Sequence, residues 1–109
     1  MMNKKIKSKP PFVIAEIGNN HEGSFQIAKK LVREAAKTGV SAVKFQTFRT
    51  EYYVNKENKK RFKQLKKFEL TKKNFIYLSQ MTKDLNMKFI STPFDLDSAN
   101  FLSKIVDIF

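Results

Sequence analysis

The stretch IAEIGNNHEG at residues 14–23 runs an apolar strand into a carboxylate and then into a polar loop that contains glycine. Glu16 interrupts the apolar run, where a charge is costly unless it is paired or has a chemical role. In α/β enzymes, catalytic groups lie where a strand ends and a loop leads into a helix. This stretch therefore predicts a strand, a loop and a helix, with a functional carboxylate between them.

Two later segments repeat this arrangement. AVKFQTF at residues 42–48 carries a lysine and a glutamine near its end, and FISTPF at residues 89–94 carries a serine and a threonine. Each segment is short, apolar and followed by polar residues, as expected of a buried parallel strand. Three strands with polar carboxyl ends indicate part of an active site.

Helical patterns separate these strands. Ser24 is expected to cap the first helix and Gly39 to end it. Thr71 is expected to cap a later helix, with Leu70 and Phe75 at the two positions of a hydrophobic staple. The predicted elements are strands at 12–17, 42–48 and 88–94, helices at 24–38, 59–68 and 71–86, a helix capped by Asp95 or Asp97, and the opening of a fourth strand at 106–109. Residues 49–70 are expected to form a long charged connection.

The order of these elements predicts an α/β fold made of successive parallel βα units. A parallel sheet needs helices over its faces and further strands at its edges. We therefore expect residues 12–109 to be the amino-terminal part of a larger, truncated domain, preceded by a basic flexible arm at residues 1–11. A compact α/β protein of three or four strands is the alternative.

The composition narrows the function classes. The chain has no cysteine, which excludes a disulfide framework and a thiolate metal site. No apolar run is long enough to cross a membrane, so a cytoplasmic protein is the expectation. The net charge of +12 invites nucleic-acid binding. However, the basic residues are nearly all lysines, whereas nucleic-acid surfaces favour arginine, so the basic segment 56–73 is expected to be a solvated surface.

The polar side chains at the strand ends define a candidate site. Because side chains alternate between the faces of a strand, Glu16, Lys44, Gln46 and Thr92 would converge at a barrel mouth if their face lines a barrel. Lys44 and Thr92 could bind a phosphate or carboxylate, while Glu16 handles a proton or a sugar hydroxyl. The alternative is a Glu16–Lys44 ion pair alone, with Gln46 and Thr92 as satisfied polar groups. Ser91, on the opposite face, is expected to cap the neighbouring turn.

His21 is the only histidine of the chain. A loop histidine without partners is expected to be exposed to solvent or bonded to the backbone. One histidine does not make a metal site, so no metal ligands are predicted in this chain.

Together, AEIGNNHEGS, AVKFQTF, LKKFEL and FISTPFD resemble the N-acetylneuraminate (sialic acid) synthase family, including the legionaminate and pseudaminate synthases, in the order which that family shows. The resemblance covers residues 12–109. It implies the amino-terminal portion, about three to four βα units, of a (β/α)8 TIM barrel. It also implies an enzyme that condenses phosphoenolpyruvate with an N-acetylmannosamine-like sugar to give a nonulosonic acid and phosphate.

The resemblance further implies roles for four residues. Glu16 matches the glutamate of the family's EIGxNHxG motif, close to the sugar aldehyde and a metal-bound water, and is the expected catalytic residue. Lys44 and Gln46 match the VKxQ motif, where the lysine holds phosphoenolpyruvate and the glutamine reaches the sugar or the pyruvyl group. Thr92 matches the threonine of STPF and would help to bind phosphoenolpyruvate.

Other parts of the family's site are expected beyond Phe109. They include a lysine and a serine of the fourth strand, the histidines that bind a divalent metal (manganese or magnesium), and a small antifreeze-like carboxyl domain. The complete enzyme would be a homodimer, and the acceptor sugar would be read by later residues. We therefore expect the 109-residue chain alone to be inactive. The alternatives are one chain of a split barrel that assembles with a separate carboxyl-terminal chain, or a small basic module that binds nucleic acid.

Overall fold

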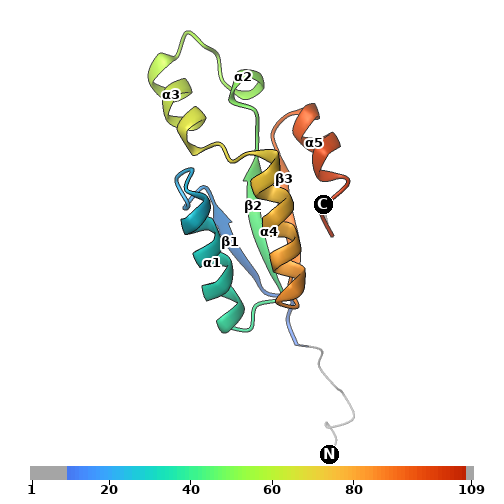
Figure 1. Cartoon of the computed structure of the whole chain (residues 1–109). Coiled ribbons are helices and arrows are strands. Elements are labelled where there is room, and N and C mark those ends of the chain that lie inside the picture. The colour runs from blue at the N-terminus through green and yellow to red at the C-terminus, as the bar shows by residue number, and fades with distance from the viewer. Residues whose placement is uncertain (1–9, 108–109) are drawn as a thin grey trace, which may run out of the picture.

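The computed structural model describes residues 10–107 and shows an α/β fold with a three-stranded parallel sheet (Figure 1). The strands lie in the order β1–β2–β3 and all run in the same direction. The strands are β1 (Ile14–Gly18), β2 (Ala42–Thr47) and β3 (Lys88–Pro93), and the helices are α1 (Phe25–Lys37), α2 (Thr50–Tyr53), α3 (Lys59–Phe68), α4 (Lys72–Asp84) and α5 (Leu96–Leu102). Within residues 10–107, no helix is long and apolar enough to span a membrane.

Polar caps begin the helices at the predicted positions. The side chains of Ser24, Thr71 and Asp95 each accept a hydrogen bond from a backbone N–H of the first helical turn. Thr71 and Asn74 bond reciprocally in a capping box. Asp95 is thus the cap of α5, and α1 ends before Gly39, whose φ of +78° suits a residue without a side chain.

Helices cover one face of the sheet. α1 and α4 lie side by side over this face, and α5 packs against β3 (Figure 1). The core between strands and helices contains Ile17, Val43, Phe45 and Phe89 from the sheet and Ala28, Val32, Phe75, Leu78 and Leu102 from the helices. Leu70, at the other position of the predicted staple, belongs to the same core. The opposite strand face carries the candidate site residues, so the predicted division of the strand faces is confirmed.

Several predicted boundaries differ from the structure. β1 begins at Ile14, the partner of Ala42 at the start of the β1–β2 register, and not at residue 12. The Val13 carbonyl oxygen, just before β1, accepts from the N–H groups of Ser41 and Ala42. The short helix α2 in the charged connection was not predicted. Asp107 is not in a strand, although its N–H and its carboxylate both bond to the backbone of Phe89 in β3. The rest of the predicted fourth strand, residues 108–109, and most of the predicted arm, residues 1–9, lie outside the described residues.

Ser91 does not cap a turn, so that prediction was wrong. Its hydroxyl lies 2.6 Å from the hydroxyl of Thr47, and both residues are buried. The two hydroxyls face each other from adjacent strands, and one donates a hydrogen bond to the other. The bond joins β2 and β3 near their carboxyl ends.

Gly23 lies in the β1–α1 turn, where that turn meets the end of α3. Its φ is +83°, and a Cβ at this position would overlap the backbone carbonyl of Lys67. We expect Gly23→Ala to lower the free energy of unfolding by about 2–4 kcal/mol, because it adds both backbone strain and a clash. Gly39 is the matched control, because its φ is +78° with no atom within 4 Å of the added Cβ. Gly39→Ala should lower the free energy of unfolding by about 1 kcal/mol. If urea unfolding gave equal losses for Gly23→Ala and Gly39→Ala, the role of the Lys67 contact would be contradicted.

Candidate functional site

Glu16 and Lys44 lie side by side on the face of the sheet opposite α1 and α4, which no helix within residues 10–107 covers (Figure 1). They are direct partners in the β1–β2 register, and Lys44 Nζ lies 3.5 Å from Glu16 Oε1. The Lys44 side chain is 35% exposed and the Glu16 side chain is 56% exposed, so both remain open to a ligand. The ion pair that the sequence offered as an alternative therefore forms, and it leaves both groups accessible.

A break in the strand pairing brings Gln46 to the same place. The β1–β2 register shifts between Glu16 and Gly18, and Gly18 has a φ of +56°. The chain then turns over β2, and Asn19 Nδ2 donates a 2.9 Å hydrogen bond to Gln46 Oε1. A Cβ placed at Gly18 would lie 3.6 Å from Glu16 Oε2 and 3.8 Å from Gln46 Nε2, so these two side chains flank the glycine.

Thr92 completes the predicted set. It is the direct partner of Gln46 in the β2–β3 register, and both residues are half-buried near the carboxyl ends of their strands. Three adjacent strands thus place a carboxylate, an ammonium, an amide and a hydroxyl on one face. Such a group can bind an anion through Lys44 and Thr92 and can exchange a proton through Glu16.

His21 is buried in the β1–α1 turn, with 1% of its surface exposed. Its Nδ1 accepts a 2.9 Å hydrogen bond from the Gly23 N–H, which confirms a backbone-bonded histidine rather than a solvent-exposed one. Its ring stacks on Phe45, with 6.0 Å between centroids. Desolvation lowers the pKa of His21 from 6.5 to about 4, so the ring is neutral and carries its proton on Nε2.

The lowered pKa of His21 predicts a loss of stability in mild acid. The unfolded chain binds a proton near pH 6.5 but the folded chain only near pH 4, so stability is full above pH 6.5 and falls as the pH drops towards 4. The histidine should remove about 2 kcal/mol of unfolding free energy between pH 7 and pH 5. Urea unfolding of the unmutated protein and of His21→Gln at both pH values measures how much of the pH-dependent loss of stability is due to His21. An equal pH dependence in the two proteins would contradict it.

Metal-binding side chains do not cluster in the part of the chain that the structure describes. No group of three or more histidine, cysteine, aspartate or glutamate side chains with metal-binding geometry occurs among residues 10–107. His21 lies in the core, with Nδ1 already bonded. That this chain supplies no metal ligand stays a prediction.

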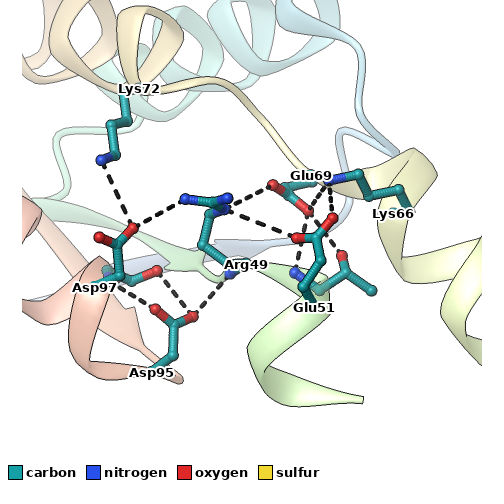
Figure 2. Close-up of polar contacts among 9 residues, drawn as sticks. Arg49, Glu51, Lys66, Glu69, Lys72, Asp95 and Asp97 are labelled. Atoms are coloured by element: carbon teal, nitrogen blue, oxygen red, sulfur yellow. Dashed lines mark hydrogen bonds and ion pairs between the residues drawn. The ribbon is translucent and has the colours of Figure 1, made fainter. Parts of the chain in front are cut away.

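A polar cluster at the carboxyl end of the sheet was missed by sequence reasoning (Figure 2). Arg49 follows β2, and its backbone N–H donates to Asp95 at 2.8 Å while its guanidinium bonds Asp97 at 3.2 Å. Glu69, just before α4, accepts hydrogen bonds from the Thr50 N–H and hydroxyl at 3.2 and 2.8 Å. These bonds tie the ends of the 49–70 connection to each other and to the turn before α5. The only available signal was that charged residues directly follow β2 and β3.

Lys66 joins this cluster from α3. It lies 2.6 Å from a carboxylate oxygen of Glu51 and 3.4 Å from one of Glu69, and Lys72 lies 3.6 Å from Asp97. The hydrogen bond between Lys66 and Glu51 holds the pKa of Glu51 below its usual range and raises the pKa of Lys66. Part of the basic segment 56–73 is therefore paired with acidic residues within the fold, and these pairs tie the connection to the carboxyl end of the sheet.

Comparison with known proteins agrees with the sequence motifs. The sequence profile of the NeuB family matches residues 31–109. The chain is 38% identical over 120 residues to the N,N'-diacetyllegionaminic acid synthase of Legionella pneumophila, a match that covers 92% of this chain and 34% of that protein. It is also 39% identical over 99 residues to an uncharacterised protein of Methanocaldococcus jannaschii, with 91% and 29% covered.

A solved structure extends the match to the fold. The sialic acid synthetase of Leptospira borgpetersenii, solved in complex with citrate, superposes with a TM-score of 0.83 and 37% identity, covering 89% of this chain and 34% of that one. The three βα units are thus the amino-terminal portion of a TIM-barrel fold of the sialic acid synthase type. The chain spans about a third of the length of the relatives that it matches.

Proposed function

The chain belongs to the NeuB family, and we propose that it supplies part of the active site of an enzyme that condenses phosphoenolpyruvate with an N-acetylmannosamine-like sugar. The products would be a nonulosonic acid and phosphate. The observation that carries this proposal is the grouping of Glu16, Lys44, Gln46 and Thr92 on the sheet face opposite α1 and α4. The similarity to legionaminic and sialic acid synthases supports the same reaction class.

Each side chain has a role in this proposal that follows from its chemistry. Lys44 and Thr92 bind the anionic groups of phosphoenolpyruvate, one by charge and the other by a hydroxyl donor. Carbon 3 of the enol attacks the sugar aldehyde carbon. The Glu16 carboxylate takes a proton from the water that adds to carbon 2 and passes it to the former aldehyde oxygen. Water adds to carbon 2, and phosphate leaves. Gln46 bonds to oxygen atoms of the sugar or of the pyruvyl group.

We further propose that a polypeptide of these 109 residues does not catalyse the reaction alone. On the strand face that carries the site, the side chains of Lys44 and Glu16 are 35% and 56% exposed. Parallel sheets in enzymes are instead covered on both faces. The remaining proposals follow from the reaction and the family resemblance. They are a homodimer, a divalent manganese or magnesium ion, and action in the cytoplasm, where phosphoenolpyruvate is made.

The complete gene product provides the test of this function. It should release phosphate from phosphoenolpyruvate only when an N-acetylated aldehyde sugar and a divalent metal are present. Mass spectrometry should find a product heavier than the sugar by one pyruvate unit. N-acetylmannosamine, its 6-phosphate and diacetylated legionaminate precursors, assayed in parallel, identify the acceptor. Phosphate release that does not depend on any sugar, or none with any of them, would contradict the proposal.

A further inference from the structure

Asn19 contacts the candidate site from the β1–α1 turn. Its Nδ2 donates a 2.9 Å, partly buried hydrogen bond to Oε1 of Gln46, which lies 27 positions later in the chain. The bond therefore connects the turn after one strand to a site residue on the next strand. The strand-face pattern did not include Asn19, because the residue follows the end of β1.

The turn that carries Asn19 is fixed by its own hydrogen bonds. The Glu22 N–H donates to the Asn19 carbonyl oxygen at 2.9 Å, and the Gly23 N–H donates to His21 Nδ1 at 2.9 Å. The His21 ring is buried against Phe45, which anchors the turn in the core. Asn19 therefore reaches Gln46 from a backbone that has little freedom to move.

The hydrogen bond determines what Gln46 offers to a ligand. The terminal torsion angle of glutamine is broadly distributed, so without a fixed partner the amide can turn either its oxygen or its nitrogen towards a ligand. Here Oε1 is engaged by Asn19, and Nε2 lies on the side of Gly18 and Glu16. An amide nitrogen is only a donor, so Gln46 offers N–H groups to oxygen atoms of a bound molecule.

We propose that Asn19 is a positioning residue, which holds the Gln46 amide so that its N–H groups point at carboxylate or hydroxyl oxygens of the substrate. Asn19 would strengthen substrate binding through Gln46. This inference rests on the proposed function of the site, and it adds a residue that the motif assignments do not include.

A double-mutant cycle on stability tests the contact without reference to activity. Asn19→Ala and Gln46→Ala, made in the complete gene product, should each change the unfolding equilibrium constant by about fivefold. The double variant should change it by clearly less than the product of the two effects, because the shared bond is lost only once. Asn100→Ala is the control, because it makes the same substitution at an exposed position of α5. When it is combined with Gln46→Ala, the change in the unfolding equilibrium constant should equal the product of the two single changes. Independent effects of Asn19→Ala and Gln46→Ala would overturn the inference.

A kinetic cycle tests whether the contact positions the substrate. Asn19→Ala should raise KM about tenfold with kcat changed less than twofold, and it should have almost no effect in the Gln46→Ala background. A purely structural role would give the same loss in both backgrounds, and either that result or an unchanged KM would overturn the inference. Failure of the proposed function has a different signature, because the unmutated protein would then release no phosphate. The stability cycle would in that case decide the inference by itself.

Discussion

Glu16→Gln is expected to lower kcat of the complete enzyme by about a hundredfold to ten-thousandfold, the usual range for loss of a general acid or base. Glutamine keeps the size and the hydrogen-bonding capacity of the side chain but cannot transfer a proton. The substitution also leaves Lys44 without its partner at 3.5 Å, so binding of an anionic substrate should be retained or improved. The effect should therefore appear in kcat and much less in KM.

Glu22→Gln is the matched control for this prediction. It removes the same charge from the turn that follows β1, at an exposed position with no place in the proposed site. Steady-state phosphate release with both variants, together with their thermal unfolding, separates chemistry from stability. Glu16→Gln with the turnover of the unmutated enzyme would show that Glu16 is not the proton-transferring group.

Lys44→Ala is expected to raise the KM for phosphoenolpyruvate by about 30-fold to 100-fold. Removing a charged partner from an anionic ligand usually costs about 2–3 kcal/mol, which corresponds to a change of this size. The substitution also leaves the Glu16 carboxylate uncompensated beside the substrate, which adds repulsion. Titration calorimetry of phosphoenolpyruvate binding measures the loss directly.

Lys88→Ala provides the comparison. Lys88 is exposed at the amino end of β3, on the same sheet but at the opposite end from the candidate site. Lys88→Ala changes the net charge by the same amount as Lys44→Ala. Its effect on phosphoenolpyruvate binding therefore reports only the general electrostatic contribution. If Lys44→Ala and Lys88→Ala weakened binding equally, the specific role of Lys44 would be contradicted.

The candidate site was predictable because it follows from local rules. Alternation along each strand sorted Glu16, Lys44 and Gln46 onto one face without any knowledge of tertiary contacts. Helix caps such as Ser24 and Thr71 were also predictable, because a cap needs only a polar side chain and the next few backbone N–H groups.

Contacts between distant segments were not predictable in this way. The Asn19–Gln46 bond depends on a register shift at Gly18, and alternation cannot show where a strand breaks its pairing. The Arg49–Asp97 bond joins positions 48 residues apart. From the sequence, Arg49 was only part of a charged connection and Asp97 only a possible helix cap. His21 was expected in a loop, and only the packing of its ring on Phe45 reveals that it is buried.

The most direct measurement is a crystal structure of the complete gene product with phosphoenolpyruvate. It tests the central claim that the strand face opposite α1 and α4 binds the substrate. We expect the phosphate or carboxylate of phosphoenolpyruvate within hydrogen-bonding distance of Lys44 Nζ and Thr92 Oγ1, with Gln46 Nε2 facing a ligand oxygen. Phosphoenolpyruvate bound elsewhere, with Lys44 still paired only with Glu16, would contradict the account.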